Sequence, residues 1–333
     1  MAVTMADVAR AAGVSLKTVS RVVNHEPHTR PEVVERVTRA IAELGWVAHG
    51  GARAMRTGRT DRIAIAVSSL ENPSTTMLVE ALAAEAGRRG LAVGLEPTHN
   101  DPERAARVLA SCGRLYDGVL VLGEAAAGVS PDAAPGAVVT VQGAHRGPGR
   151  VGSDLDAAAG VLVRHVATMR RRRVVLLGLA PREPAGGAEE ADGGTTLIDA
   201  VRRALPQPPV AVLALREDSR AAGAEAAETL LGDHPDADAV LCETDEIALG
   251  LLSALARRGV PLPARIAITG FGATEDGRYT TPSLTTVDPG YPVLAREALD
   301  ALEARLAGRP VEIRRPTPIE LIRRESTLGT VLG

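Results

Sequence analysis

The sequence predicts an α/β fold with a small all-α head at the N-terminus, followed by a larger two-lobed body with parallel sheets. The first 60 residues show helical periodicity and hold nine Lys/Arg against five Asp/Glu, a net charge of about +4, whereas the rest of the chain carries about −7. From residue 61 onward, apolar strand-like runs alternate with helical stretches, which is typical of parallel sheets with helices on both faces. These strand–helix units fall into two groups of four, which indicates two similar lobes.

Length and composition limit the classes of protein. The chain has 333 residues, of which 45% are hydrophobic and 24% charged, and this favours a globular protein with two or three domains. No apolar run reaches 18 residues, so no transmembrane helix is expected, and the N-terminus lacks the pattern of a secretory signal. Cys112 and Cys242 lie in apolar contexts, where buried thiols are expected rather than a disulfide or metal site. We therefore expect a cytoplasmic protein that needs no metal or cofactor.

Three short helices are expected in the head, each with its own start or stop signal. Thr4 is a favourable N-cap, and Asp7 follows at the spacing of a capping box. Gly13 ends the first helix, because glycine readily adopts the left-handed conformation that closes a helix. Ser15 is expected to cap the second helix, and Pro31 suits the first turn of the third. The helices are expected over residues 5–12, 16–24 and 31–45.

The elements of the body follow from apolar runs that alternate with longer helical stretches. Strands are expected over residues 62–67, 91–96, 117–122, 137–141, 173–179, 210–215, 237–242 and 265–271. Helices are expected between them, including residues 76–90, 101–112, 157–170, 220–232 and 245–258. Ligands of such sheets bind beyond the carboxyl ends of the strands, so the cleft between the lobes is the expected ligand site.

The first two helices are expected to form a helix-turn-helix. Ala9 is small enough for the helices to approach closely, Gly13 makes the turn, and Val19 and Val22 pack the second helix inward. Because basic charge concentrates on this second helix, a DNA-reading surface is favoured over a helical hairpin with a solvated face. The outward side chains are those of Leu16, Lys17, Ser20 and Arg21.

The segment TMADVARAAGVSLKTVSRVVN resembles the N-terminal signature of the lactose-repressor (LacI) family of bacterial transcription regulators. The likeness covers nearly the whole chain, through VVERVTRAIAELGW, NPS at 72–74, YDGVLVLG, TDEIALGLLSALARRGVPLPARIAITGFG, TPSLTTVD and RRESTL. The resemblance implies a DNA-binding head, a hinge helix and a two-lobed effector domain similar to a periplasmic binding protein.

The resemblance also implies the domain boundaries. A helix-turn-helix DNA-binding domain is expected over 1–48, a hinge helix or linker over 49–60, and an effector-binding and dimerisation domain over 61–333. Lobe N is expected to hold about 61–156 and 289–315, and lobe C about 157–288 and 316–328. The chain would then cross between the lobes near 156, 288 and 316.

The resemblance places Leu16 and Lys17 at the first two positions of a recognition helix that reaches base edges in the major groove. Lys17 is the only lysine of the chain. A lysine there donates to guanine O6 and N7, as Arg21 does with a bidentate fork, although a contact with phosphate alone is an open alternative for Lys17. The expected DNA-contacting residues are Thr4, Met5, Ser15, Leu16, Lys17, Thr18, Ser20, Arg21, Asn24, His28, His49, Ala52, Arg53 and Met55.

In the family the linker folds into a hinge helix on the operator, and a leucine from each subunit enters the minor groove. Met55 stands at that position here, and methionine is an apolar side chain that can serve as a wedge. Gly50 and Gly51 are poor helix formers, so the stability of this hinge helix is an open question.

The expected effector site departs from the pattern of sugar-responsive family members. Glu189 or Glu190 stands where an arginine grips ligand hydroxyls, Thr244 replaces an asparagine, and Gly272 replaces an aspartate. The stacking aromatic falls at Ser219 or Arg220, and Gln142 stands where aspartate is common, so most sugar-binding chemistry is missing. Asn72, Asp154 and Asp245 keep the usual type, although Asp245 could equally serve as a helix cap. The expected effector-binding residues are Ser69, Asn72, Ser74, Gln142, Glu190, Arg220, Thr244, Asp245 and Gly272.

We therefore expect a homodimeric transcription regulator, more a repressor than an activator, that binds a palindromic operator and responds to a small molecule in the cleft. The chain has only one Trp, three Tyr and one Phe, and Glu189, Glu190, Asp192 and Glu243 are acidic, so the ligand is not expected to be a neutral hexose. An amine-bearing ligand is one hypothesis, and solvated loop acids are its alternative. A regulator without an effector and a solute-binding protein are the rival functions. No nucleophile–base pair, metal-ligand cluster or phosphate loop stands out, so no enzyme is expected.

Overall fold

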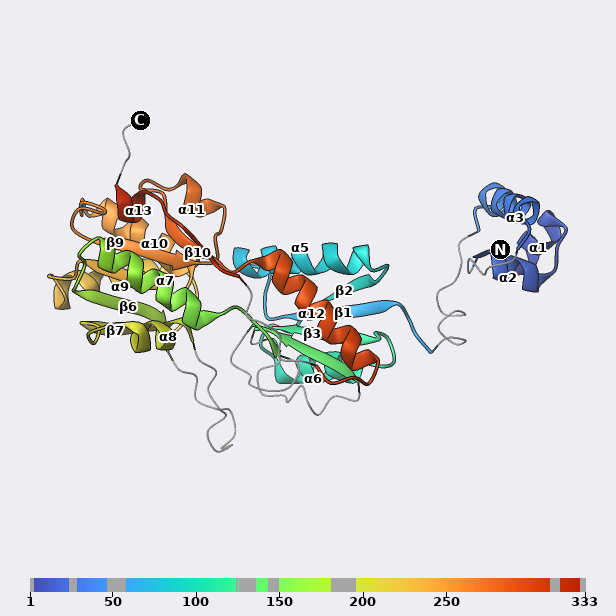
Figure 1. Cartoon of the computed structure of the whole chain (residues 1–333), viewed down its shortest axis with the longest axis horizontal. Helices are drawn as coiled ribbons and strands as arrows, with labels where there is room; N and C mark the ends of the chain where they lie inside the picture. The colour runs from blue at the N-terminus through green and yellow to red at the C-terminus, as the bar shows by residue number, and fades with distance from the viewer. Residues whose placement is uncertain are drawn as a thin grey trace. The chain divides into compact units, whose positions relative to one another are not determined.

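The computed structural model describes residues 3–23, 29–46, 58–123, 125, 136–142, 150–180, 196–311 and 318–329. The chain divides into two compact units, a head (Met1–Thr60) and a body (Asp61–Gly333). Figure 1 shows the elements of each unit along the chain.

The head is a three-helix unit of α1 (Met5–Ala12), α2 (Leu16–Val23) and α3 (Pro31–Leu44). The expected capping box is confirmed, because the Thr4 hydroxyl accepts from Asp7 N and the Asp7 carboxylate accepts from Thr4 N. Gly13 and Gly45 close α1 and α3 with a φ of 61° each, in the left-handed region that glycine adopts readily. The three helices bury one common core of Val8, Ala9, Ala12, Val19, Val22, Val37, Ala40 and Trp46.

The first lobe of the body, lobe N, is built on a parallel sheet with strand order β2-β1-β3-β4-β5. Its strands are β1 (Arg62–Val67), β2 (Ala92–Pro97), β3 (Gly118–Leu122), β4 (Ala137–Val141) and β5 (Arg150–Val151). Alternate residues of β1 point to opposite faces. Ile63 and Ile65 pack with α5 (Pro73–Arg88) and α12 (Tyr291–Leu306), whereas Ala64 and Ala66 face the side of α6 (Pro102–Ala110).

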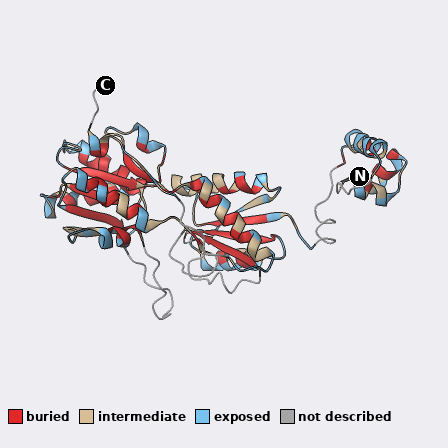
Figure 2. Ribbon diagram, viewed as in Figure 1, coloured by how far each residue is buried: buried red, intermediate tan, exposed pale blue. Residues whose placement is uncertain are grey.

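The second lobe, lobe C, is built on a sheet with strand order β11-β10-β9-β8-β6-β7, in which only β11 pairs antiparallel. Its strands are β6 (Val174–Leu179), β7 (Ala211–Leu215), β8 (Ala239–Cys242), β9 (Ala267–Phe271), β10 (Thr285–Asp288) and β11 (Glu320–Ile322). Helices α7 (Leu155–Thr168) and α8 (Leu197–Ala204) cover one face, and α9 (Arg220–Asp233) and α10 (Asp245–Arg257) cover the other. Figure 2 shows both sheets buried between their helices. The short helices α11 (Asp276–Tyr279) and α13 (Glu325–Leu328) complete the lobe.

Helices α9 and α10 approach each other through two glycines. A Cβ atom at Gly223 would overlap the carbonyl oxygen of Ile247, and one at Gly250 would overlap that of Arg220. Glycine is therefore required at both positions, and this close contact fixes the N-termini of α9 and α10 beside the ends of β7 and β8.

The predicted order of elements agrees with the structure. The eight expected strands are confirmed to within a few residues at each end. Helix α5 begins at Pro73 rather than at residue 76, because Asn72 caps it and proline suits its first turn. The elements not predicted from the sequence are β5, α8, β10, α11, α12, β11 and α13.

Both cysteines are free and buried, as expected for small apolar side chains. Among the described residues, no helix has the length and apolar character needed to span a bilayer.

Candidate functional site

The outer face of α2 carries the side chains that the sequence assigns to DNA reading. Leu16, with 52% of its surface exposed, and the charged Lys17 and Arg21 lie on this face, whereas Val19 and Val22 are buried against α1 and α3. An apolar side chain beside basic ones suits a major groove that presents thymine methyl groups next to guanine acceptors. The exposed face of α2 is therefore a candidate nucleic-acid interface.

The polar residues at the helix starts position this face. The Ser15 hydroxyl accepts from Thr18 N at 3.2 Å and shares a hydrogen bond with the Thr18 hydroxyl at 2.9 Å, so it fixes the first turn of α2. The Thr4 hydroxyl donates to Asp7 at 2.7 Å, and this bond, together with that from Arg10, holds the pKa of Asp7 below its usual value. Amide groups at such N-termini attract phosphate oxygens.

The other predicted DNA-contacting residues have varied placements. Thr4 is exposed, Thr18 and Ser20 are half-buried on α2, and Met5 packs partly against the core of the head. Seven predicted site residues lie outside the described residues, namely Asn24, His28, His49, Ala52, Arg53, Met55 and Glu190.

The expected cleft residues lie at the carboxyl ends of the strands in both lobes, as the strand–helix pattern predicts. Ser69 follows β1 and accepts a hydrogen bond from Glu71 N at 3.1 Å. Gln142 follows β4 with a φ of 57° and donates through Nε2 to the Ser153 hydroxyl at 3.3 Å. These two side chains are thus engaged within lobe N.

Asn72 and Thr244 cap the helices that begin at this edge of the two sheets. Asn72 Oδ1 accepts from Ser74 N at 2.9 Å at the start of α5, and the Thr244 hydroxyl accepts from Ile247 N at 3.3 Å at the start of α10. The Asn72 amide nitrogen and the Thr244 hydroxyl hydrogen are therefore left to donate a hydrogen bond beyond the end of each sheet.

Both donors bond to Asp218, which is not among the site residues predicted from the sequence. Asn72 Nδ2 donates to Asp218 Oδ2 at 2.7 Å, and the Thr244 hydroxyl donates to Asp218 Oδ1. Burial is the main cause that raises the pKa of Asp218, the nearby Glu246 raises it further, and the bonds from Thr244 and Asn72 oppose the shift. Glu243 lies close by, and burial raises its pKa as well, although Leu179 N donates to its carboxylate at 2.7 Å. Two partly buried carboxylates with raised pKa values thus lie near the carboxyl ends of β7 and β8.

A second contact between the lobes surrounds Gly272, which has a φ of 135°. A Cβ atom there would lie 2.5 Å from Ser74 Oγ, so the aspartate that the family resemblance implies at this position would displace the Ser74 hydroxyl and strain the backbone at this φ. The buried Tyr291 hydroxyl donates to the carbonyl oxygen of Gly272 at 3.1 Å. The structure therefore brings Asn72 and Thr244 together at Asp218, and Ser74 together with Gly272 in a second contact.

Two other predicted effector residues have their side chains engaged elsewhere. Asp245 is fully buried, and its carboxylate accepts hydrogen bonds from Thr274 and Thr286 inside lobe C. The guanidinium group of Arg220 makes two bonds of 2.9 Å to Glu246 and also pairs with Asp276. Among the described contacts, neither the Asp245 carboxylate nor the Arg220 guanidinium group bonds to Asn72 or Asp218. The sequence positions of Asp245 and Arg220 alone do not show which way their side chains point.

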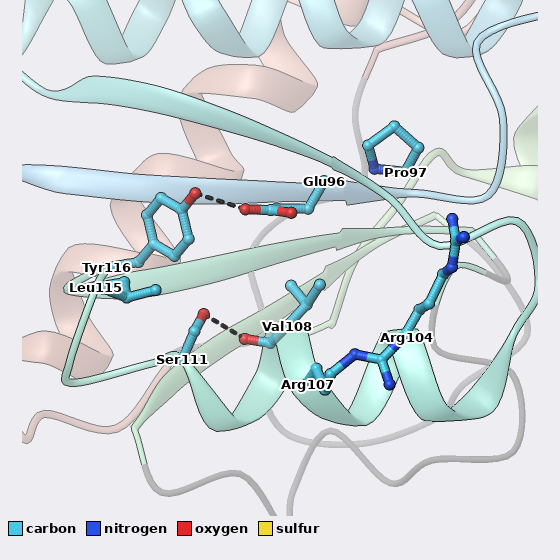
Figure 3. Close-up of a pocket in the computed structure, with 8 residues that line it drawn as sticks. All are labelled: Glu96, Pro97, Arg104, Arg107, Val108, Ser111, Leu115 and Tyr116. Carbon is cyan, nitrogen blue, oxygen red and sulfur yellow. Dashed lines mark hydrogen bonds between the residues drawn. The ribbon is translucent and has the colours of Figure 1, made fainter.

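Two hollows lie elsewhere in the body, away from Asn72 and Asp218. One of about 330 Å³ lies between β2 and α6 in lobe N, where the Tyr116 hydroxyl donates to Glu96 at 2.6 Å and Arg104 and Arg107 extend from α6 (Figure 3). The other, of about 550 Å³, is lined by residues of α9, α10 and α11 that include Arg220 and Tyr279. Asn72 and Asp218 line neither hollow.

Comparison with known proteins gives two family matches. Residues 4–48 match the family described as bacterial regulatory proteins, lacI family, and residues 163–327 match the periplasmic binding protein-like domain. The HTH-type transcriptional regulator GntR of Pseudomonas aeruginosa is 29% identical over 97% of this chain and 95% of its own length.

Solved structures give the same result. A protein described as a LacI-family transcriptional regulator from Sanguibacter keddieii is 32% identical, with a TM-score of 0.68 over 81% of this chain and 99% of its own. The Lac repressor dimer bound to operator and the anti-inducer ONPF shares the fold, with a TM-score of 0.82 at 22% identity over 98% of this chain and 99% of its own. With its helix-turn-helix head and two-lobed body, the chain belongs to the LacI family of bacterial transcription regulators.

Proposed function

We propose that this regulator is a repressor that binds a near-palindromic operator as a homodimer, with one α2 helix in the major groove of each half-site. The exposed Leu16, Lys17 and Arg21 on a helix whose opposite face is buried are the observation that carries this proposal. A two-fold dimer presents two such helices, which accounts for a palindromic site. The similar Lac repressor has been solved as a dimer on its operator, which supports the same arrangement. The protein would act by binding, without catalysis, in the cytoplasm.

The proposal assigns residues 1–48 to DNA binding, 49–60 to a hinge, and 61–333 to dimerisation and effector binding. Lobe N would hold about 61–156 and 289–315, and lobe C about 157–288 and 316–328. In the hinge, Met55 would enter the minor groove at the centre of the operator, with Ala52 and Arg53 beside it.

The effector would bind between the lobes, beside Asn72, Ser74 and Thr244. The desolvated carboxylates of Asp218 and Glu243 support a ligand that offers hydrogen-bond donors, an amine above all, because a buried carboxylate is stabilised by such donors. Gly272 and Thr244 supply neither the aspartate nor the asparagine expected of sugar-responsive members, which disfavours a neutral hexose. A regulator without an effector is the rival proposal.

Operator selection from random DNA tests the DNA-binding proposal. The full chain should recover a near-palindrome with half-sites about one helical turn, roughly 10 base pairs, apart. Affinity should fall steeply with salt, because basic side chains release counterions when they neutralise phosphates. A monomer that protects one asymmetric site in a footprint would contradict the proposal.

Glucose and glucosamine form a matched pair for the effector proposal, since they differ by one amine in place of a hydroxyl group. We expect amine-bearing ligands to raise the melting temperature of the protein and to change its mobility shift on the selected operator, and glucose to do neither. Release from the operator by glucose, with a large rise in melting temperature, would contradict the ligand class. If neither this pair nor a wider panel of amines and polyols has any effect, the rival without an effector is favoured.

A further inference from the structure

The side chain of Asp218 links the two lobes directly. It lies between β7 and α9 in lobe C and receives one hydrogen bond from each lobe, from Asn72 at the start of α5 and from Thr244 at the start of α10. Asn72 and Asp218 are 146 positions apart in the sequence, so only the closed arrangement of the lobes brings them together.

The orientation of the Asn72 amide group is set by its own helix. Because Oδ1 accepts from Ser74 N at 2.9 Å, the amide nitrogen is the group left to face lobe C, and it lies 2.7 Å from Asp218 Oδ2. The capping geometry of α5 therefore aims a donor across the cleft. An N-cap asparagine is suited to both tasks, whereas an N-cap serine or aspartate can cap the helix but has no amide donor.

The Asp218 carboxylate is stabilised by the hydrogen bonds that Asn72 and Thr244 donate to it. This carboxylate is partly desolvated, and Glu243 and Glu246 add negative charge nearby, although Arg220 pairs with Glu246. Loss of the Asn72 donor would leave a partly buried, partly desolvated carboxylate with one of its two hydrogen bonds. Opening of the lobes would hydrate it, so the closed state and this hydrogen bond are thermodynamically coupled.

We propose that the Asn72–Asp218 hydrogen bond is a latch that holds the two lobes together in the absence of any ligand. The inference deepens the proposed function and depends on it only in treating this cleft as the effector site. A ligand that enters the cleft must then compete with Asn72 for Asp218, so it has to present a donor group of its own. Asp218 is in this way a specificity-determining residue of the site.

The substitution Asn72→Asp tests the latch in the full chain. It keeps the acceptor that caps α5 but places a second carboxylate opposite Asp218. Hydrogen–deuterium exchange, measured without DNA or ligand, should become about tenfold faster in residues 68–76 and 216–223, because the amides on both sides of the cleft become exposed. Asn72→Ser, which retains a capping oxygen but cannot reach Asp218, should act in the same direction without adding charge.

The double substitution Asn72→Asp with Asp218→Asn exchanges donor and acceptor and should return exchange in both segments to the wild-type rate. Asp101→Asn is the matched control, because Asp101 is also an N-cap followed by proline, at the start of α6, and its side chain accepts only from its own helix at 2.9 Å and 3.4 Å. This control should leave both segments unchanged.

The latch is refuted if Asn72→Asp and Asn72→Ser both exchange like the wild type, or if the double substitution is no slower than Asn72→Asp alone. A failure to bind any operator would refute the proposed function and leave this measurement intact, since the exchange experiment contains neither DNA nor ligand.

Discussion

Replacement of Lys17 by alanine is expected to remove the preference for one base in each half-site, with a loss of about 1–3 kcal/mol for the preferred base. Lys17 is exposed on the first turn of α2, and the buried Val19 and Val22 fix the rotation of that helix against the head. A side chain held on this face reaches base edges when the helix enters the major groove. Operator selection with the wild type and the variant, at one salt concentration, measures the change position by position.

The alternative for Lys17, a contact with phosphate alone, predicts a different result. Binding would then weaken about equally on all sequences, and the dependence of affinity on salt would fall by about one charge. Lys17→Arg is a useful second variant because it keeps the charge. It should preserve the salt dependence and sharpen the preference for guanine, since the guanidinium group bonds to O6 and N7 together. Uniform weakening by Lys17→Ala would contradict a base contact.

Signals close together in the sequence predicted the head almost completely. Thr4 with Asp7, Gly13 and Pro31 each act on a backbone within a few residues, so their effect is readable without knowledge of the fold. The strands of the body that consist of near-continuous apolar runs were likewise predicted from the sequence. The antiparallel β11 was missed, because three residues that pair with β10 across the sheet leave no periodic pattern.

The cleft was predicted less well because its geometry depends on pairs that are distant in sequence. Arg220 was predicted to bind the effector because of its place in the family pattern, but it pairs with Glu246 and Asp276. Asp218, two residues earlier, is the residue that contacts Asn72. The available signal was an acidic residue at the carboxyl end of a strand, just before an N-cap serine. That signal does not reveal which side chain faces the other lobe, because the direction of each side chain depends on how α9 packs on α10.

The substitution Asp245→Ala is expected to reduce the free energy of unfolding of the body by about 3–5 kcal/mol, because it removes an acceptor that is shared by three buried donors. The sequence allowed either a ligand-binding or a structural role for Asp245. In the structure, Thr274 N donates to Oδ2 at 2.7 Å, the Thr274 hydroxyl donates to it at 3.1 Å, and the Thr286 hydroxyl donates to Oδ1 at 2.6 Å. Alanine would leave all three donors buried without an acceptor.

The surroundings of Asp245 are shaped to hold its carboxylate. Gly270 on β9 lacks a Cβ atom that would overlap Asp245 Oδ1, and Thr244 rather than Asp245 caps α10. Burial raises the pKa of Asp245 despite its hydrogen bonds, so ionisation of this group costs stability as the pH rises from 3.8 through the raised pKa. The three donors offset part of that cost in the folded state.

Urea unfolding followed by circular dichroism at pH 7 measures the effect of Asp245→Ala. Asp154→Ala is the matched control, because the Asp154 side chain caps α7 by accepting from Ala157 N at 2.8 Å, and loss of this cap should cost about 1 kcal/mol. Asp245→Asn should fall between the two, since its amide oxygen still accepts from Thr274 while Thr286 must turn to accept a hydrogen bond. If Asp245→Ala were no less stable than Asp154→Ala, Asp245 would not be the structural centre of this network, and a role in ligand binding would be favoured instead.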